Sequence, residues 1–375
     1  MNSFLKVILS FIVFITFTIV GCKDKTDLQI SLKEIFKDYY LIGTALNYEQ
    51  VMGRNPKAIE LVKQQFNSII PENILKWERV HPEPGVFNFE PADSLVAFGL
   101  RNKMFIIGHT LLWHQQTPNW VFDDKDGKPV SRDTLLLRLK NHIQKVVGRY
   151  KGKINGWDVV NEAIDEDGNY RKSKWLEIIG EDYIDKAFQF AHEADPNAEL
   201  YYNDFNMWYP GKIKGVEKLV KELQTKNIKI DGIGLQGHWG LDYPSNEEID
   251  LALETYSKLN VNLMITELDM AVLPIPDNNT SAEISKNYEL KKEYDPFTNS
   301  FPDSMQVKLG KRYADFFNLF NKYKNHISRV TFWGVSDANS WRNNWPILGR
   351  TSYPMLFDRN YLPKPAFDYV IKTVK

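Results

Sequence analysis

Short apolar runs alternate with helix-like segments along most of this chain. In the segments 135–147 and 184–191, apolar residues recur at three- and four-residue spacing, the pattern of a helix with one buried face. The alternation of strand and helix, repeated eight times, predicts an α/β fold, the (β/α)8 TIM barrel. The eight expected strands lie in the ranges 36–47, 66–70, 104–108, 154–160, 198–202, 230–235, 261–265 and 328–333.

The barrel is expected to form one domain over residues 36–375. Barrels of this type take about 250 residues and exceed about 400 with insertions, so this length fits a single domain with long loops after its strands. The longest departure from the alternation is the segment 273–304, which is rich in Pro, Asn, Asp and Ser. We interpret it as a loop insertion.

The N-terminus has the features of a secretory signal. Lys6 precedes an almost unbroken apolar run from Val7 to Val20, and Gly21 and Cys22 follow it. The run is short for a membrane-spanning helix, which needs about 20 apolar residues. We expect residues 1–21 to be a lipoprotein signal peptide, Cys22 to be its lipidation site and residues 22–35 to be a tether. The alternatives are an uncleaved anchor or a thiol with no such role.

This interpretation predicts an exported protein that is lipid-anchored to the bacterial envelope or cell surface. Cys22 is the only cysteine, so none would remain for a disulfide or a thiolate metal site. The 47 basic residues nearly balance the 48 acidic ones, which offers no electrostatic footprint for nucleic acid. The 10 Trp, 18 Tyr and 22 Phe fit either a large core or a surface that stacks on sugar rings, and composition does not choose between them.

Two of the expected strands end in glutamates. The run that begins at Gly156 ends in Asn161 and Glu162, and the run that begins at Val261 reaches Glu267 as its first acidic residue. Either glutamate alone is more often an ordinary surface residue at a strand end. The carboxyl ends of barrel strands form one face, where such enzymes place their sites, so the two together predict a working pair.

Polar and aromatic residues follow the other expected strands as well. Carboxylates and amides hydrogen-bond hydroxyls and indoles stack on pyranose rings, so this set suits a sugar site. Taken singly, His109 and His238 are more often structural imidazoles, and Lys76 is more often a solvated cation. The residues at these strand ends are Glu72, Asn73, Lys76, Trp77, His109, Trp113, Asn203, Asp204, Gln236, His238, Asp269, Trp333, Asp337 and Trp341.

Seven ordered motifs resemble those of glycoside hydrolase family 10, the family of endo-β-1,4-xylanases. The resemblance extends from about Tyr40 to the end of the chain. Seven motifs in order are far more specific than any one of them. They are PENILKWE (71–78), GHTLLWHQQTPNW (108–120), WDVVNEA (157–163), YYNDFN (201–206), GLQGHW (234–239), ITELD (265–269) and FWGVSDANSW (332–341).

The resemblance implies a retaining endo-hydrolase of β-1,4-xylosidic bonds in xylan, with Glu162 as acid/base and Glu267 as nucleophile. It also implies that His238 hydrogen-bonds Glu267 and that Asp269 fixes the tautomer of His238. The chain departs from the family in the loop after Glu267 and at 342–353, and these departures concern the leaving-group side of the cleft. The substrate-binding set implied is Glu72, Asn73, Lys76, His109, Trp113, Asn161, Gln236, His238, Trp333 and Trp341.

Acetal hydrolysis needs an acid at the leaving oxygen and a negative charge facing the anomeric carbon. Carboxylates about 5 to 5.5 Å apart give retention and those about 6.5 to 9.5 Å apart give inversion. The sequence does not supply this distance, so retention rests on the resemblance. We expect an ionised Glu267 to raise the pKa of Glu162, and Asn161 to hold the 2-hydroxyl of the attacked sugar.

Other chemistries find little support in the sequence. It has no His-Glu-x-x-His motif, no Gly-rich phosphate loop and no cysteine cluster, and the acidic stretches 123–127 and 165–169 lack the spacing of a calcium loop. We therefore expect no metal or cofactor. The expected partners are xylan or xylo-oligosaccharides, with no nucleic acid, with membrane contact only through a lipid anchor, and with a monomeric chain.

Two rival functions remain open. A non-catalytic lipoprotein that captures polysaccharide would need the tryptophans but not both Glu162 and Glu267. A related barrel glycosidase would act on cellulose, mannan or galactan instead. Lys76 together with Asn73 and His109 favours xylan, because these residues resemble the xylanase pattern.

Overall fold

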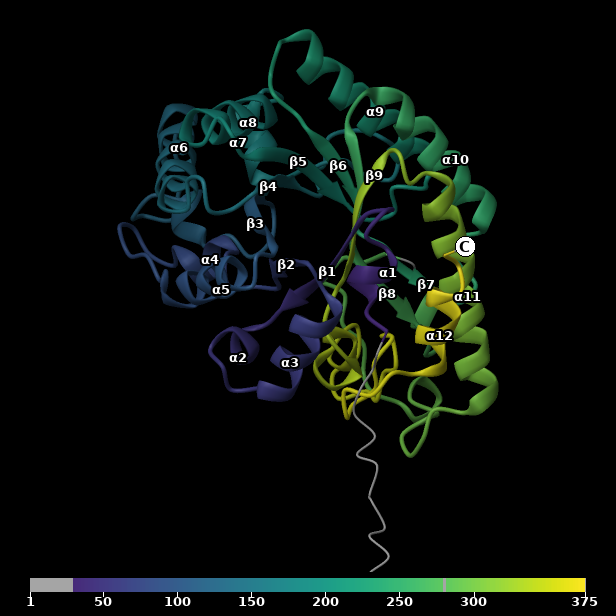
Figure 1. Cartoon of the computed structure of the whole chain (residues 1–375). Helices are drawn as coiled ribbons and strands as arrows, with labels where there is room; N and C mark the ends of the chain where they lie inside the picture. The colour runs from purple at the N-terminus through teal and green to yellow at the C-terminus, as the bar shows by residue number, and fades with distance from the viewer. Residues whose placement is uncertain (1–29, 279–280, 375) are drawn as a thin grey trace, which may run out of the picture. The chain divides into compact units, whose positions relative to one another are not determined.

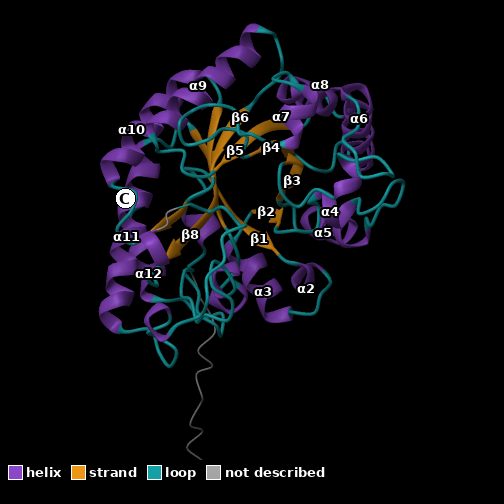
Figure 2. Cartoon of the chain, turned by 180° about the vertical axis from the view of Figure 1, so that it is seen from behind, coloured by secondary structure: helices purple, strands orange, loops and turns teal. Residues whose placement is uncertain are grey.

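The computed structural model describes residues 30–278 and 281–374, and its compact unit begins at Ser31. Eight parallel strands form a closed barrel in the order β6-β5-β4-β3-β2-β1-β9-β8, with β8 pairing back onto β6. Figures 1 and 2 show this ring of strands with helices around it. The strands are β1 (Leu41–Leu46), β2 (Ser68–Pro71), β3 (Phe105–Trp113), β4 (Gly156–Asn161), β5 (Glu199–Asp204), β6 (Gly232–Leu235), β8 (Asn262–Ala271) and β9 (Ile327–Phe332).

The (β/α)8 barrel predicted from the sequence is therefore confirmed. A ninth short strand of the described residues, β7 (His238–Gly240), pairs only with β8 and lies at the edge of the site. Two barrel strands run further than their apolar stretches, because β3 continues to Trp113 and β8 to Ala271. These extensions carry site residues on the strands themselves.

The helices cover the outside of the barrel with their apolar faces inward. In α8, Ile184, Ala187, Phe188 and Ala191 are all buried, as the spacing predicts. The helices are α1 (Leu32–Ile35), α2 (Tyr48–Val51), α3 (Pro56–Gln65), α4 (Trp77–Val80), α5 (Glu90–Arg101), α6 (Arg132–Arg149), α7 (Lys174–Ile179), α8 (Tyr183–Ala194), α9 (Pro210–Thr225), α10 (Asn246–Tyr256), α11 (Asp303–Lys322) and α12 (Pro365–Ile371).

The folded unit begins earlier than the sequence indicated. Residues 31–35, expected to belong to the tether, include α1, and Leu32 is fully buried. Ser31 Oγ donates to the carbonyl of Gln64 at 2.6 Å, and the Leu32 amide donates to Gln65 Oε1 at 2.9 Å. The first strand then starts at Leu41 rather than at residue 36, because a turn follows α1. The expected signal peptide and Cys22 lie outside the described residues.

Apolar packing fills both the space between strands and helices and the barrel itself. Gly108 allows the fully buried Trp157 to lie against its strand, since a Cβ at Gly108 would come within 2.1 Å of the indole ring. The smaller interior cluster reaches the carboxyl face of the barrel through Trp333, so the core supports the site directly. That cluster comprises Ala45, Ile70, Ile107, Tyr201, Met264 and Trp333.

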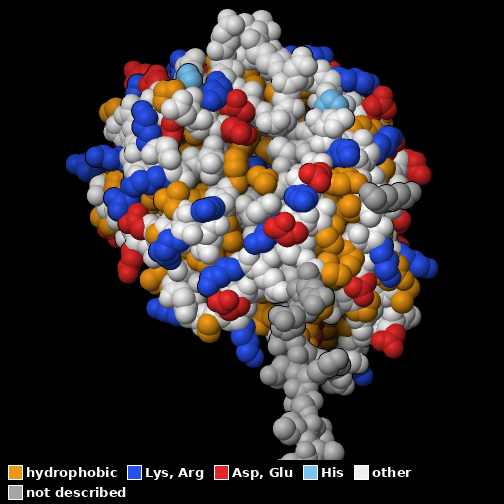
Figure 3. Space-filling model, in the orientation of Figure 1, with side chains coloured by type: hydrophobic (Ala, Val, Ile, Leu, Met, Phe, Trp, Pro, Cys, Tyr) orange, Lys and Arg blue, Asp and Glu red, His pale blue; other side chains and the backbone are white. Residues whose placement is uncertain are grey.

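The insertion predicted at 273–304 is a loop with two short 3-10 turns, and its last two residues already belong to α11. It is tied to the segment after β9, where the Thr351 amide donates to Asp295 at 3.1 Å and the Tyr353 hydroxyl donates to the Phe297 carbonyl at 2.7 Å. Basic and acidic side chains are interspersed over the face drawn in Figure 3. Within the described residues, no helix has the length and apolar character needed to cross a membrane.

Candidate active site

The carboxyl ends of the barrel strands bring the predicted site residues together. Glu72 follows β2, His109 and Trp113 lie on β3, and Glu162 follows β4. The remaining residues come from the other half of the ring, where β8 carries two acidic residues and β9 leads into two tryptophans. These are Gln236 after β6, His238 on β7, Glu267 and Asp269 on β8, Trp333 after β9, and Trp341 in a short 3-10 turn.

Glu162 is buried and held by three side-chain donors. Trp113 Nε1 donates to its Oε2 at 2.7 Å, and Gln236 Nε2 donates to its Oε1 at 2.9 Å. Asn161 Nδ2 lies 3.2 Å from the same Oε1. The φ of Glu162 is 58°, a left-handed conformation that is uncommon for a residue with a Cβ. The backbone therefore turns sharply here and presents the carboxyl to the cleft.

Burial raises the pKa of Glu162 above its ordinary value. The charge of Asp204 adds to this effect, while His114 and the donors Gln236 and Trp113 partly oppose it. The sequence predicted that the charge of Glu267 raises this pKa, whereas burial is the main cause and the carboxylate that contributes is Asp204. Such a carboxyl holds a proton to higher pH, as a general acid must.

Glu267 has the opposite electrostatic surroundings. Burial alone would raise its pKa, but the hydrogen bond from His238 and the positive charges of His109, His238 and Lys76 outweigh burial and lower it. His238 Nε2 lies 3.1 Å from Oε2, and Asn203 Nδ2 donates to Oε1 at 2.7 Å. Glu267 is therefore kept ionised, as an attacking carboxylate must be.

Amide side chains link the two glutamates. Asn203 Nδ2 donates both to Glu267 Oε1 and to Asn161 Oδ1, the latter at 2.9 Å. Thr266 Oγ1 in turn donates to Asn203 Oδ1 at 2.6 Å. Asn203 was not among the predicted binding residues, although it was noted at a strand end within the YYNDFN motif. Its double contact is non-local, so only the structure reveals it.

His238 lies between two carboxylates. Its Nδ1 is 3.0 Å from Asp269 Oδ1 and its Nε2 faces Glu267. Burial would lower its pKa, but Asp269 and Glu267 together raise the pKa to about 9. The expected contacts of both ring nitrogens are present, and a pKa raised in this way favours a ring that donates to both carboxylates.

Asp269 is fully buried and receives three donors. Besides His238, Arg342 Nε donates to Oδ1 at 2.7 Å and Trp341 Nε1 donates to Oδ2 at 2.5 Å. Burial alone would raise the pKa of Asp269, but Arg342 and His238 outweigh burial and lower this pKa, so the carboxyl stays ionised. Positive and negative charges therefore alternate from Arg342 through Asp269 and His238 to Glu267. Arg342 is the first residue of the segment 342–353, in which the chain departs from the family pattern. It was not predicted to belong to this array.

Lys76 is buried beside the cleft rather than solvated. Its Nζ donates to Asn73 Oδ1 at 2.9 Å and lies 4.8 Å from the centre of the Trp113 ring. Asn73 Nδ2 donates to Glu72 Oε1 at 3.1 Å. Burial lowers the pKa of Lys76, against the attraction of Glu267 and other carboxylates, and burial raises the pKa of Glu72. These residues form a polar wall of the site.

Imidazole and indole rings form the floor of the cleft. His109 Nδ1 lies 2.9 Å from Asp158 Oδ2, and its ring meets Trp333 edge to face at 5.4 Å. Trp341 stacks on Trp345 at 4.5 Å. Trp157 and Trp175, interpreted from the sequence as core residues, are buried, which confirms that prediction.

The insertion after β8 reaches the loops beside Glu162. Glu283 accepts a hydrogen bond from Gln115 and lies 3.8 Å from His114 Nε2 and 3.7 Å from Arg171 Nη1. The interaction with His114 is the main cause that lowers the pKa of Glu283 to about 2. Arg171 Nε also donates to the Glu162 carbonyl at 2.8 Å. Glu283 and Arg171 were not predicted, because nothing local marks them.

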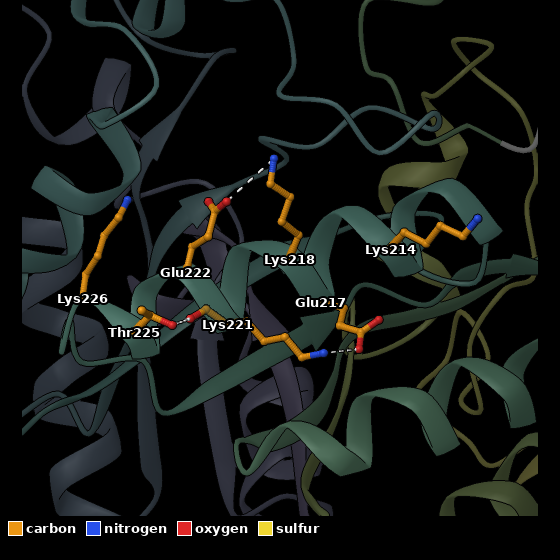
Figure 4. A pocket seen from close by; sticks show the side chains of 7 residues that line it. All are labelled: Lys214, Glu217, Lys218, Lys221, Glu222, Thr225 and Lys226. Atoms are coloured by element: carbon orange, nitrogen blue, oxygen red, sulfur yellow. Dashed lines mark hydrogen bonds and ion pairs between the residues drawn. The ribbon is translucent and has the colours of Figure 1, made fainter.

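In the described residues, neither a metal-binding cluster nor the surface pocket along α9 contributes to the candidate site. Within residues 30–278 and 281–374, no cluster of three His, Cys, Asp or Glu side chains could hold a metal ion. Figure 4 shows the side chains that line a surface pocket along α9, where Lys218 pairs with Glu222 at 3.7 Å and Lys221 with Glu217 at 2.6 Å. It contains none of the predicted site residues.

Comparisons with known proteins agree over nearly the whole folded unit. The model of glycosyl hydrolase family 10 matches residues 31–373. Endo-1,4-beta-xylanase A of Xylanibacter ruminicola is 46% identical over 344 residues, which cover 92% of this chain and 93% of the relative. The beta-1,4-xylanase of Dictyoglomus thermophilum is 38% identical over 99% of both chains.

Solved structures show the same relationship. A family 10 endoxylanase retrieved from a sugarcane soil metagenome superposes with a TM-score of 0.89 at 43% identity, covering 91% of this chain and 99% of that one. A xylanase from Paenibacillus barcinonensis, solved with a conduramine derivative, gives 0.83 at 40% identity, covering 92% and 99%. The barrel, the family match and these relatives together show that the chain is a glycoside hydrolase and belongs to glycosyl hydrolase family 10.

Proposed function

We propose that this protein hydrolyses internal β-1,4-xylosidic bonds of xylan with retention of configuration. The observation that carries the proposal is the pair of buried carboxyls with opposite pKa shifts, raised at Glu162 and lowered at Glu267. One carboxyl that keeps its proton and one that loses it are what a glycosidase uses as its acid and its second carboxylate, and the resemblance to family 10 supports retention. The relatives named as xylanases support xylan as the substrate.

In the first step, the carboxylate of Glu267 attacks the anomeric carbon while Glu162 gives its proton to the departing oxygen. The donors His238 and Asn203 hold the attacking group in place. In the second step, water enters where the leaving sugar was and attacks the anomeric carbon while Glu162 takes a proton from it. The bond between that carbon and Glu267 breaks, which releases the sugar and restores the carboxylate. Formation of the bond to Glu267 removes the negative charge of that carboxylate, which favours the ionised form of Glu162 and suits it to act as a base.

The polar and aromatic residues around the pair suit a chain of neutral sugars. Asn161 is next to both glutamates and can hold the 2-hydroxyl of the attacked sugar, a contact that strengthens as charge develops on the ring. Lys76 and Glu72 offer a donor and an acceptor to the next sugar. Trp333 and Trp341 offer ring faces for stacking. The remaining members of the set are Asn73, His109, Trp113, Gln236 and His238.

The substrate is tested by a reducing-sugar assay on xylan, carboxymethyl cellulose and mannan. We expect release from xylan at least about a hundredfold faster than from the other two. Faster hydrolysis of cellulose or mannan would assign the barrel to another polysaccharide. Absence of hydrolysis in all three, with substrate still bound, would favour the capture lipoprotein.

We further propose that the enzyme is exported, attached to the envelope through lipidated Cys22, and monomeric. This proposal rests on the sequence, namely Lys6, the apolar run at 7–20 and the single cysteine. More than one acyl chain makes such an anchor stable. No cofactor is needed for this chemistry.

A further inference from the structure

A polar pocket lies between the β1 and β2 loops and the segment after β9. Its volume is about 450 Å³, within the range of small-ligand sites. Asn47 and Glu72 line it on one side, and Trp341, Arg350 and Arg359 line it on the other. Of these, Arg350 lies within 342–353, the segment in which the chain departs from the family pattern, whereas Trp341 belongs to the matching motif and Arg359 follows the segment.

Arg350 is a buried charge without an ionic partner. Only 4% of the residue is exposed, and its guanidinium donates to the carbonyls of Pro274 at 3.1 Å and Trp345 at 3.4 Å. In the described part of the chain, no carboxylate lies within ion-pair distance of Arg350. Burial and the nearby charge of Arg342 lower the pKa of Arg350 to about 10, against the attraction of Asp295 and Tyr243. Buried charges are costly unless they are paired, so an anion here would be favoured.

Arg359 adds a second guanidinium to the same pocket. It donates to Asn343 Oδ1 at 2.9 Å and to the Ser352 carbonyl at 2.8 Å, and it also forms no ion pair with a described residue. Arg342, close by in the chain, is matched by Asp269 at 2.7 Å. Charge is therefore balanced at Arg342 but remains positive in the pocket, where Glu72 is the one carboxyl among the lining residues.

The pocket lies on the side of the cleft away from Glu162. In the ring of eight strands, β9 stands opposite β4, which carries Glu162 at its end. If Glu162 protonates the leaving oxygen, the pocket adjoins the sugars that stay attached to the enzyme during the first step. The segment after β9 therefore borders the sugars that stay attached to the enzyme. Glu283, in the insertion, borders the leaving-group side.

We infer that this pocket binds a sugar carboxylate, namely a uronic acid branch on the retained side of the xylan chain. Guanidinium groups match carboxylates in geometry as well as charge, and the asparagines around them can hold the hydroxyls of the branch. The inference rests on the proposed function, because it assumes xylan in the cleft. It adds a preference for acidic branches, which neutral-sugar contacts alone would not give.

The test compares three oligosaccharides that have the same xylose backbone. The first is undecorated, the second carries a uronic acid on a retained sugar, and the third carries the same branch with its carboxyl reduced to an alcohol. We expect the wild-type kcat/KM to be at least about tenfold higher on the acidic substrate than on the reduced one. Rising salt should narrow this ratio, because charge pairing is screened.

Variants then assign the preference to the pocket. Arg350→Gln should bring the ratio between acidic and reduced substrates close to one, and Arg359→Gln should lower it in part. Arg350→Lys keeps the charge and should retain more of the ratio than Arg350→Gln. The matched control is Arg54→Gln, an exposed arginine paired with Glu49 outside the pocket, which should leave the ratio unchanged.

The outcomes separate the two proposals. Hydrolysis of none of the three substrates would remove the proposed function. Equal wild-type rates on acidic and reduced substrates, with good hydrolysis of the undecorated one, would overturn the inference alone. Equal losses on all substrates in Arg350→Gln would show that Arg350 only braces the carbonyls of Pro274 and Trp345, which also overturns it. If Arg350→Gln does not fold, the inference is tested by the ratio of kcat/KM between acidic and reduced substrates, measured in the wild type and in Arg359→Gln.

Discussion

At the residue scale, two glutamates of the same type acquire different acidities from their neighbours. Both are buried, and burial alone would raise both pKa values. Glu267 additionally accepts a hydrogen bond from the His238 imidazolium, whereas the direct donors to Glu162 are the neutral Trp113 and Gln236, and the charge of His114 does not outweigh its burial. A full positive charge lowers a carboxyl pKa more than neutral donors do, so the histidine separates the two roles.

Replacing each glutamate with alanine should give different failures. Glu162→Ala should slow xylan hydrolysis by about two to four orders of magnitude, the usual contribution of general acid catalysis. An aryl xyloside with an activated phenol needs no acid, so this variant should complete the first step and then stall. Added azide should release the sugar with retained β configuration. Glu267→Ala should fail in the first step on both substrates.

The product of azide rescue checks these roles. In Glu267→Ala, azide can only attack from the vacated face and gives the inverted α product, measurable by NMR. Exchange of the two stereochemical results would reverse our assignment. Wild-type hydrolysis of xylan by either variant would remove that residue from the mechanism.

His238 should control the pH at which Glu267 ionises. In His238→Gln the imidazolium is lost, so the pKa of Glu267 should rise and the acidic limb of kcat/KM against pH should move upward. A hydrogen bond to a charged group is worth about 1.5 to 3 kcal/mol. Since one pKa unit corresponds to about 1.4 kcal/mol, the expected movement is about one to two pH units. An acidic limb in the same place would show that His238 does not support the nucleophile.

The contacts of His238 with Glu267 and Asp269 should also make the stability of the protein depend on pH above neutrality. The folded pKa of His238, about 9, is above its unfolded value of about 6.5, so the stabilisation is complete below pH 6.5 and is lost as pH rises through 9. The free energy of unfolding of the wild type, measured from pH 6 to 10, should fall more steeply than that of His238→Gln. Parallel curves would contradict this linkage.

At the element scale, a stacked aromatic cluster fixes the short helix α4, which follows Lys76. His142 of α6 stacks on Trp77 of α4 at 3.6 Å, and His81 at the end of α4 stacks on Phe87 at 3.9 Å. The two histidines meet through their Nδ1 atoms at 3.1 Å. Burial lowers the pKa of His81 to about 4 and that of His142 well below its ordinary value. The cluster is therefore built for neutral imidazoles.

Acid should loosen this cluster. Because both folded pKa values are depressed, the stability present above pH 6.5 is lost as pH falls toward 4. The melting temperature of the wild type should drop over this interval, and that of His142→Gln should drop less from a lower starting value. His192→Gln, at an exposed position of α8, is the control and should follow the wild type. An equal drop in His142→Gln would locate the acid sensitivity elsewhere.

The sequence predicted the eight strands because each barrel strand is a buried apolar run between two helices. It did not predict that β3 extends to Trp113, because His109 and Thr110 interrupt the apolar pattern where the strand enters the site. The two glutamates were predictable from their strand ends. Asn203, Arg342 and Glu283 were not, since their partners are brought close only by closure of the barrel and by the insertion.

At the scale of the whole molecule, closure of the ring sets two different walls on either side of the carboxylate pair. The β3 and β4 loops and the tip of the insertion at Glu283 border Glu162. The β1 and β2 loops and the segment after β9 form the other wall, with Arg350 inside it. The insertion contacts both walls, because it holds Glu283 near Glu162 and accepts a hydrogen bond from Arg350 at the Pro274 carbonyl, so a change in this loop can affect both sides of the cleft.

The proposed lipid anchor at Cys22 is tested by the variant Cys22→Ser. Thioether lipidation needs the sulfur, so the serine variant should lose incorporation of a labelled fatty acid and should no longer fractionate with membranes. Lys23→Ser keeps the cysteine and should be labelled as the wild type is. The barrel begins at Ser31, so xylan hydrolysis in extracts should be the same in all three proteins. Unchanged labelling of Cys22→Ser would end the lipoprotein proposal and leave the enzymatic one intact.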